Sequence, residues 1–188
     1  MADIMKTYTD IPGWYDWHNT MKRLVMKFFP VNGIYLEVGV WKGKSLVAFA
    51  HEANRLGRKP VLIGIDTFGG KQDDAMMDNL VTNSGGDFLP ETRQNLREAN
   101  VDAELIRNDS QRQAPLIDDE SIDFILIDAL HSYEAVKADT QAYWPKLKKG
   151  GVMLWHDVDR PEVAKAVTDA IGHDWHREKP RIGYARKK

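Results

Sequence analysis

The sequence predicts a doubly wound α/β domain with a mostly parallel sheet and helices on both faces. Five short apolar runs alternate with longer amphipathic segments. Several of these runs are nearly continuous in Ile, Leu and Val, which is typical of strands covered on both sides. The chain has 188 residues, of which 43% are hydrophobic and 29% charged. That length and composition fit one globular domain spanning residues 1–188.

The order of elements follows from hydrophobic patterning and stop signals. A helical segment within residues 1–30 precedes the first strand, and a C-terminal β-hairpin adds two strands to the five runs, giving seven. We expect strands at 34–40, 61–66, 103–109, 122–128 and 151–157, helices at 14–29, 44–56, 90–100, 132–147 and 161–171, and hairpin strands at 173–178 and 181–186. Alternating strands and helices favour right-handed crossovers, and hence a parallel sheet.

The end of one helix and the nature of one long segment are inferred from residue types and length. Basic residues followed by Gly150 and Gly151 resemble a C-terminal stop signal for the helix at 132–147. Residues 68–89 are polar and longer than a structural connection requires. We therefore expect a variable loop or lid there, because long loops in compact domains tend to serve binding.

Composition excludes several classes of function. The chain has no cysteine, so disulfides, thiolate catalysis and cysteine-ligated metal centres are excluded. A formal net charge of -2 gives no overall electrostatic reason to bind nucleic acid or an anionic membrane. The N-terminus lacks a signal-peptide pattern, and no apolar run approaches the roughly 20 residues that span a bilayer. We expect a cytoplasmic protein.

Acidic residues close four of the five predicted strands: Asp66, Asp109, Asp128 and Asp157. In open parallel sheets, ligands bind outside the carboxyl ends of the strands. Each aspartate either caps the following helix or lines a polar cleft. Four acids along one edge favour a binding site.

The turn after the first strand indicates the ligand. Gly39 and Gly43 allow a tight turn into the next helix, but Trp41 replaces the middle glycine of a dinucleotide-binding fingerprint. Asp66 follows 27 positions after Gly39, where an acid can accept hydrogen bonds from both hydroxyls of a ribose. The pattern favours an adenosine cofactor without a pyrophosphate, of which S-adenosylmethionine is the commonest.

The chain also resembles a known family in several motifs. They are Glu37-x-Gly39-x-x-x-Gly43-x-Ser45, Gly64-Ile65-Asp66-Thr67, Ile127-Asp128-Ala129-Leu130-His131-Ser132-Tyr133-Glu134, Lys149-Gly150-Gly151-Val152 and His156-Asp157. These motifs, spread over residues 34–157, resemble the class I methyltransferases with their Rossmann-like fold. More narrowly, they resemble the small branch that includes the cephalosporin-type, macrocin-type and catechol-type O-methyltransferases. The resemblance implies methyl transfer from S-adenosylmethionine to a small hydroxylated acceptor.

Carried over to this sequence, the resemblance implies a set of cofactor contacts. Glu37, Gly39 and Ser45 are expected at the methionine end, Asp66 at the ribose, and the segment after the third strand at the adenine. The full expected set is Glu37, Gly39, Val40, Trp41, Gly43, Ser45, Asp66, Thr67, Asp109, Ser110, Gln111 and Asp128. Trp41 departs from the commonest class I pattern and leaves the path of the backbone there open.

The catechol-type resemblance further implies a divalent cation such as Mg²⁺, held by Asp128 and the pair His156-Asp157. The carboxylates suit magnesium, whereas a histidine suits manganese, iron or zinc better. Adjacent strand residues point to opposite faces, so His156 and Asp157 need a bend to share one ion.

The same resemblance implies a catalytic base at His131, three positions after Asp128, which is the other expected catalytic residue. An imidazole pKa of about 6.5 suits proton transfer at neutral pH. Without the resemblance, the simpler interpretation is that His131 caps the next helix or bonds a core carbonyl.

The sequence leaves more than one possibility for the acceptor pocket, for the oligomeric state and for the class of reaction. The aromatic residues Trp14, Tyr15 and Trp17 either line an acceptor pocket or belong to the core. The family often dimerises, so a homodimer is compatible with the resemblance. A nicotinamide-dependent oxidoreductase is the second hypothesis, because Tyr133 and Lys137 meet a Tyr-x-x-x-Lys spacing. A binding domain without catalysis is the third.

Overall fold

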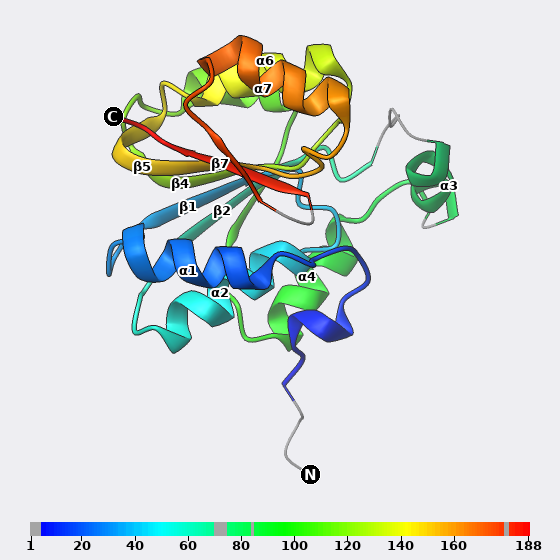
Figure 1. Ribbon diagram of the computed structural model, residues 1–188. Helices are drawn as coiled ribbons and strands as arrows, with labels where there is room; N and C mark the ends of the chain where they lie inside the picture. Colours follow the sequence, from blue (N-terminus) through cyan, green and yellow to red (C-terminus); the bar gives the residue numbers. More distant parts are fainter. Residues whose placement is uncertain (1–4, 70–74, 84, 179–180) are drawn as a thin grey trace.

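The predicted layered architecture is confirmed by a computed structural model, which describes residues 5–69, 75–83, 85–178 and 181–188 (Figure 1). Its strands are β1 (Ile34–Val38), β2 (Val61–Asp66), β3 (Glu104–Arg107), β4 (Ile122–Ile127), β5 (Leu147–Trp155), β6 (His176–Glu178) and β7 (Ile182–Arg186). They form one sheet in the order β3-β2-β1-β4-β5-β7-β6. The strands β1 to β5 pair in parallel, and β7 is antiparallel to both β5 and β6.

Helices cover both faces of this sheet (Figure 1). The helices α1 (His18–Phe28), α2 (Lys44–Arg55) and α4 (Leu89–Glu98) lie on one face, and α6 (Tyr133–Tyr143) and α7 (Pro161–Ile171) lie on the other. Shorter elements are α3 (Ala75–Asn83), α5 (Ser110–Gln113) and two 3₁₀ turns, Tyr8–Asp10 and Ala114–Leu116. None of the helices in the described ranges has the length and apolar character needed to cross a bilayer.

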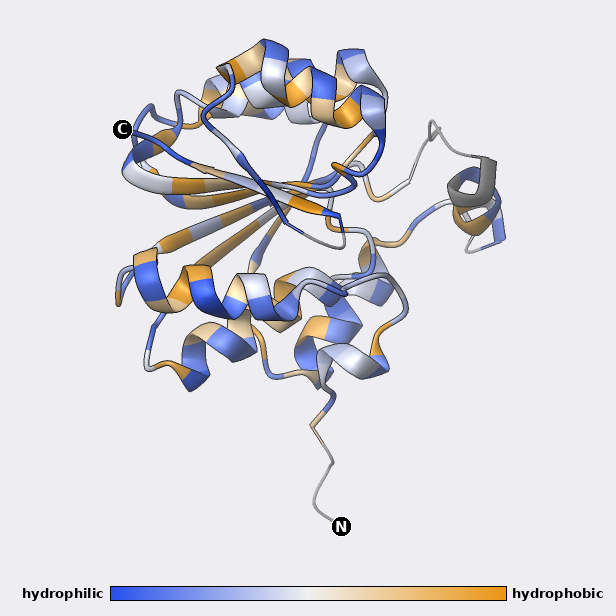
Figure 2. Ribbon diagram, viewed as in Figure 1, coloured by the Kyte–Doolittle hydropathy of each residue, from blue (hydrophilic) through white to orange (hydrophobic). Residues whose placement is uncertain are grey.

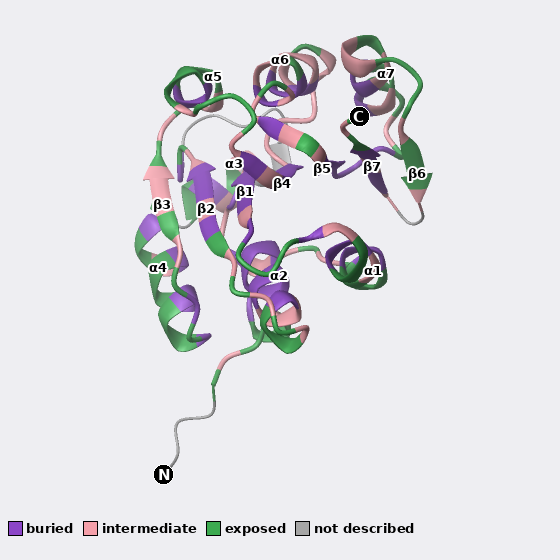
Figure 3. Ribbon diagram, turned by 90° about the vertical axis from the view of Figure 1, so that its left-hand side faces the viewer, coloured by how far each residue is buried: buried purple, intermediate pink, exposed green. Residues whose placement is uncertain are grey.

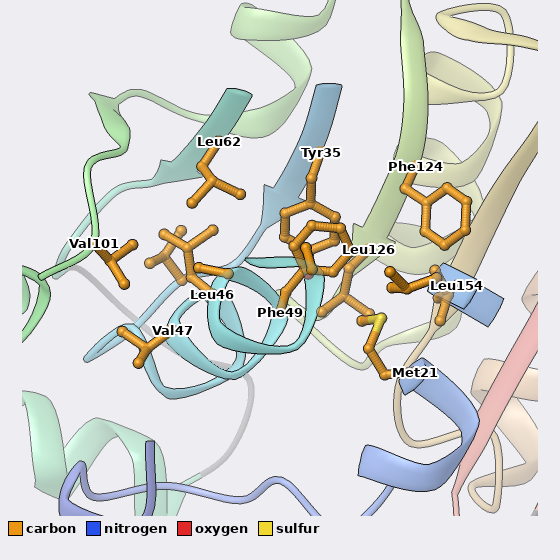
Figure 4. Close-up of a cluster of buried hydrophobic side chains, with 14 of the residues drawn as sticks. Met21, Tyr35, Leu46, Val47, Phe49, Leu62, Val101, Phe124, Leu126 and Leu154 are labelled. Atoms are coloured by element: carbon orange, nitrogen blue, oxygen red, sulfur yellow. The ribbon is translucent and has the colours of Figure 1, made fainter. Parts of the chain in front are cut away.

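Alternating side chains of the strands build a separate core on each face. Tyr35 points toward α1 and α2, whereas the next residue, Leu36, packs in the core under α6 and α7. The first core centres on Phe49 of α2, whose ring stacks on Tyr35 at 3.7 Å between centroids (Figure 4). Along the helices, hydrophobic residues alternate with hydrophilic ones (Figure 2). A strand must therefore be apolar on both sides, which explains the continuous apolar runs.

Burial decreases from the centre of the sheet to its edges (Figure 3). The strands β1 and β4 are almost wholly buried, whereas β3 and β6 at the two edges keep exposed residues. From β1, the chain proceeds outward through β2 to β3 and then returns to the other side of β1 as β4. The point where strand order reverses therefore lies between β1 and β4, and ligands of open parallel sheets bind there.

The predicted end of the helix at 132–147 was wrong. The helix ends at Tyr143, and the segment with Gly150 and Gly151 belongs to β5, which begins at Leu147. Between the pairs Ile122–Leu147 and Phe124–Val152, residues 148–151 of β5 lie opposite the single residue Asp123 of β4, so β5 bulges. The bulge is stabilised by exchange of backbone hydrogen bonds with Lys187, a residue far along the chain. Local sequence contains no sign of that partner.

Three further expectations have mixed outcomes. The segment 68–89 is not a loop throughout, because it contains α3, while residues 70–74 and 84 lie outside the described ranges. The first helix begins at His18 instead of residue 14. The terminal hairpin is present as β6 and β7, and the turn residues Lys179 and Pro180 lie outside the described residues.

One acid lies inside the first core. Glu37 on β1 is fully buried and accepts hydrogen bonds from the Tyr35 hydroxyl at 2.8 Å and the Ser45 hydroxyl at 2.6 Å. Burial raises the pKa of Glu37 to about 8, although both hydrogen bonds oppose that rise. Asp128 and Asp66 add to it by repulsion. The carboxyl is therefore easier to ionise in the unfolded chain than in the folded protein.

The substitution Glu37→Gln should remove a pH-dependent loss of stability. Since the folded pKa is raised, the wild type loses stability as the pH rises from about 4.5 to about 8. The loss should reach the order of a few kcal/mol, and the variant should lack it. Urea unfolding of both proteins between pH 5 and pH 8.5 measures the difference, in which other titrating groups cancel. An equal pH dependence in both proteins would contradict this account.

Candidate functional site

A cavity of about 540 Å³ opens at the carboxyl ends of the parallel strands. Its walls come from the segments that follow β1 to β5 and from the N-terminal segment before α1. The residues that line it include Trp14, Gly39, Val40, Trp41, Ser45, Asp66, Thr67, Asp109, Ser110, Gln111, Asp128, His131, Asp139, His156, Asp157 and Arg181. The four strand-end acids predicted to share one edge therefore do lie around one cavity.

The loop after β1 crosses the end of β4 at very close range. Gly39 has φ +88°, and a Cβ built there would lie 2.1 Å from the carbonyl oxygen of Asp128. Gly43 also has positive φ, and its Cβ would lie 2.7 Å from Leu96 of α4. Only glycine satisfies both the conformation and the space at these positions. The two glycines of the motif thus hold the loop against the switch point.

Asp66 fastens that loop. One of its oxygens, Oδ2, accepts hydrogen bonds from the backbone N–H groups of Val40 at 2.7 Å and Trp41 at 2.8 Å. The other, Oδ1, accepts one from Phe68 N–H at 2.7 Å. Trp41 has φ +46°, a conformation that non-glycine residues rarely adopt. The bond to Asp66 helps to hold it there. The carboxylate keeps acceptor capacity for further donors, since two oxygens offer about four sites.

Two tryptophans form one wall of the cavity. Trp14 stacks on Trp41 with 5.6 Å between ring centroids and 18° between the ring planes. Phe88 meets Trp41 in a T-shaped arrangement with 6.1 Å between ring centroids. Trp14 is 49% exposed, whereas Trp17 is buried in the core. Of the two tryptophans in the N-terminal segment, Trp14 therefore lines the cavity and Trp17 belongs to the core.

The expected methionine-end residues lie at two depths. Ser45, on the first turn of α2, lines the cavity, while Glu37 lies behind it and holds its hydroxyl. Thr67, at the end of β2, also lines the cavity, and its hydroxyl donates to the carbonyl of Gly69 at 2.5 Å. Glu37 thus supports the wall through Ser45.

The segment after β3 forms the opposite end of the cavity. Asp109 caps α5 by accepting hydrogen bonds from the backbone N–H groups of Gln111 and Arg112. The side chains of Ser110 and Gln111 both donate to Asp139 of α6, at 2.6 Å and 2.5 Å. Asp139 was not among the cavity residues expected from the sequence. An acid within a helix that packs on a sheet was the available signal.

A polar cluster occupies the ends of β4 and β5. Nδ1 of His156 lies 3.2 Å from both Asp128 Oδ1 and Asp157 Oδ2. Nε2 of His131 lies 2.9 Å from Asp157 Oδ2, and Arg181 donates to Asp157 Oδ1 at 3.2 Å. The strand β5 ends at Trp155, and Asp157 has φ +54°. This supplies the bend that the pair needed to face one point.

Charges within the cluster stabilise one another. Burial alone lowers the pKa of His156, but Asp128 and Asp157 outweigh it and raise the pKa to about 10. Burial also lowers the pKa of His131, and its bond to Asp157 reverses that to a net rise. For Asp157, burial would raise the pKa, but the two histidines hold it far below its usual range. The carboxylates of this cluster therefore strongly stabilise a positive charge placed beside them.

The pair behind the oxidoreductase hypothesis lies elsewhere. The Tyr133 hydroxyl donates to Asp169 of α7 at 2.7 Å and accepts from Lys137 at 3.1 Å. Neither residue is among those lining the cavity. In this position the two side chains link α6 to α7 and do not face the ligand site.

Comparisons with known proteins agree with this geometry. A family model described as a methyltransferase domain matches residues 36–158. No match was found among curated proteins. Similar solved structures share the fold at low identity. The calicheamicin methyltransferase CalS11 has a TM-score of 0.63 and 22% identity, covering 90% of this chain and 76% of its own. The O-methyltransferase NovP has a TM-score of 0.68 and 16% identity, covering 91% and 79%.

A third similar structure, from Staphylococcus aureus, carries the provisional name caffeoyl-CoA O-methyltransferase. It has a TM-score of 0.64 and 17% identity, and the match covers 96% of this chain and 87% of its own. A methyltransferase from Podospora anserina with the same fold was solved with S-adenosylhomocysteine bound. The family model covers well over half of the chain. The chain therefore belongs to the methyltransferase domain family and is an S-adenosylmethionine-dependent methyltransferase.

Proposed function

We propose that the enzyme methylates a hydroxyl oxygen of a small acceptor. The observation that carries the proposal is the cavity itself, which joins the loop fastened by Asp66 to the polar cluster of Asp128, His131 and Asp157. Such a cavity can hold a nucleoside cofactor at one end and a hydroxylated molecule at the other. The structural neighbours named above as O-methyltransferases support the same acceptor atom.

In this proposal the cofactor lies along the ends of β1, β2 and β3. The carboxylate of Asp66 accepts the ribose hydroxyls in addition to the backbone groups that it already holds. Ser45 and the backbone at Gly39 meet the methionine part. Ser110 and Gln111 meet the adenine. The sulfonium then points toward the cluster at the end of β4, because the other end of the cofactor is fixed at β3.

The acceptor end follows from what remains of the cavity. Trp14 presents the ring face that Trp41 does not cover, and this face suits an aromatic or sugar ring. His131 lines the same cavity and bonds Asp157 through Nε2. That bond orients the imidazole and, in the neutral ring, leaves the lone pair on Nδ1. The raised pKa of His131 makes the nitrogen a better base.

The reaction is one displacement with one proton transfer. The acceptor oxygen forms a bond to the methyl carbon, while the carbon–sulfur bond breaks and its electron pair returns to sulfur. The acceptor proton goes to Nδ1 of His131, and Asp157 stabilises the resulting imidazolium. Holding both reactants in line supplies much of the rate enhancement, since it replaces a bimolecular encounter.

The cluster also fits a divalent cation. Adjacent ligands of an octahedral ion at about 2.1 Å lie about 3 Å apart, and His156 Nδ1 lies 3.2 Å from both carboxylate oxygens. Asp128, His131 and Asp157 form a second set, whose ligand atoms lie within 4.8 Å of one another and which contains His131 in place of His156. We propose that Asp128, Asp157 and His156 hold the ion and that His131 remains the base. A bound ion would supply Lewis acidity that lowers the pKa of the acceptor hydroxyl.

The substitution Asp66→Ala should weaken binding of S-adenosylhomocysteine by roughly 30-fold, because it removes charge-assisted hydrogen bonds to the ribose and frees the loop. Isothermal titration calorimetry measures the affinity. Asp119→Ala is the control, since Asp119 is exposed and pairs with Lys146 outside the cavity. Equal affinity of Asp66→Ala and wild type would refute the placement of the ribose.

The substitution His131→Gln should lower kcat by about 10²- to 10⁴-fold while the affinity for S-adenosylhomocysteine changes by less than roughly twofold. Transfer of labelled methyl to any acceptor that the wild type uses, drawn from phenols, catechols and sugars, gives the rate. His176→Gln is the matched control, because His176 is exposed on the edge strand β6. A variant that keeps the wild-type rate would remove His131 from catalysis.

Removal of metal should abolish transfer, and Mg²⁺ or Mn²⁺ should restore it. Electron paramagnetic resonance with Mn²⁺ should detect about one bound ion per chain in the wild type. Asp157→Asn should lose that ion, because it loses a charged ligand, whereas Asp169→Asn on the surface should keep it. Full activity after chelation, with no Mn²⁺ binding, would contradict the metal part of the proposal alone.

A further inference from the structure

Lys and Arg side chains line the cavity at three positions in the part of the chain that the structure describes: Lys44, Arg160 and Arg181. Lys44 donates to the Ile11 carbonyl at 2.9 Å and so holds the N-terminal segment against α2. Neither arginine has a role in the methyl transfer proposed above. A guanidinium only donates hydrogen bonds, so a ligand that offers acceptors to both arginines would suit this part of the cavity.

One turn after β5 positions both arginines. The Arg160 N–H donates to the Asp157 carbonyl at 2.9 Å, and the Val158 N–H donates to the Arg181 carbonyl at 3.0 Å. Arg160 is also the N-cap residue of α7, whereas Arg181 directly precedes β7. Two segments that are distant in the sequence therefore bring an arginine each to the turn that contains Asp157.

Both arginines lie close to the proposed base. Arg181 donates from Nη1 to Asp157 Oδ1 at 3.2 Å, and the other oxygen of Asp157 lies 2.9 Å from Nε2 of His131. The positive charge of Arg160, like burial, opposes the net rise in the pKa of His131, so Arg160 is near that ring. An anion bound by these arginines would therefore lie beside the group that takes the proton of the acceptor.

Neutralising Asp157 does not account for Arg181. Asp157 Oδ2 already has His131 and His156 as partners, at 2.9 Å and 3.2 Å. Arg181 adds a single bond of 3.2 Å, whereas arginine commonly binds a dedicated carboxylate through two parallel bonds. Its Nε is buried without a hydrogen-bond partner in the described ranges and lies 3.7 Å from Asp16 Oδ2. Most of its five N–H donors therefore remain available to water or to a ligand.

We propose that the methyl acceptor carries an anionic group, a carboxylate or a phosphate, which binds Arg160 and Arg181 while the acceptor hydroxyl faces His131. The inference rests on the proposed function, because it places the acceptor at the β4 and β5 end of the cavity. The planar fork of a guanidinium donates in parallel to two oxygens and so matches either anion. The arginines bind and orient the acceptor, and they take no part in the bond changes.

The exposure of the site limits the size of the effect. The Arg181 side chain is 35% exposed, so water screens its charge in part. A hydrogen bond to a charged group still contributes more than one between neutral groups. We therefore expect each arginine to strengthen binding of an anionic acceptor by about tenfold.

The test uses matched pairs of acceptors that differ in charge. Protocatechuate and its uncharged amide form the carboxylate pair, and glucose 6-phosphate and glucose form the phosphate pair. Calorimetry on the full chain, saturated with S-adenosylhomocysteine, measures the affinity for each compound. The wild type should bind the charged member of at least one pair more tightly by at least about tenfold, and the pair that responds identifies the anion. A wild type that favours neither charged member would overturn the proposal.

Two variants assign the preference to the arginines. Arg160→Gln and Arg181→Gln should each weaken binding of the charged member by about tenfold and change that of the uncharged member by less than roughly twofold. A merely structural role would weaken both members equally. Arg55→Gln is the matched control, because Arg55 pairs with Glu52 at the last turn of α2 and does not line the cavity.

The outcomes separate two failures. Variants that keep the wild-type preference, or that weaken both members of a pair equally, would overturn the anion proposal. Equal methyl transfer to the charged and uncharged members would remove the anion and leave the proposed O-methylation standing, whereas a wild type that does not bind S-adenosylhomocysteine would overturn the placement of the cofactor. If Arg181→Gln does not fold by circular dichroism, Arg160→Gln decides the matter, because Arg160 lies on a different element.

Discussion

The carboxylate of Asp66 is the contact on which the arrangement of the site depends. Parallel pairing of β1 with β2 places the ends of both strands at one edge, and Asp66 then bonds two backbone amides of the loop that leaves β1. Those bonds hold Trp41 in a left-handed conformation, and Trp41 in turn holds Trp14. One charged group at a strand end thereby positions the loop, the aromatic wall and the space between them.

The sheet provides a rigid base because each of its central strands is buried on both faces. Neighbouring side chains such as Tyr35 and Leu36 belong to different cores, so a shift of register would disturb both at once. The loops at the carboxyl ends are then attached to strands that cannot slide. Side chains on different loops, such as His131 and Asp157, can therefore meet at hydrogen-bonding distance.

Charge in the site is arranged as two groups with different tasks. Around β4 and β5, two carboxylates and two histidines create a strong attraction for a proton or a metal ion. At the far end of the cavity, Asp139 uses its charge to orient neutral side chains. In both groups a buried carboxylate without partners would destabilise the fold, and neighbouring side chains therefore donate hydrogen bonds to it.

The sequence by itself determined the layered fold, the five parallel strands and the row of acids at their ends, because apolar runs and turn residues record which faces are buried. It also located Gly39 and Gly43, whose conformations only glycine allows together with such close approach. Tertiary structure alone decided that the residues before Val152 bulge within a strand and that Trp14 lines the cavity while Trp17 lies in the core. It also decided that Asp139 accepts hydrogen bonds from the segment after β3. Each of these depends on a partner distant along the chain, and local periodicity contains no information about such a partner.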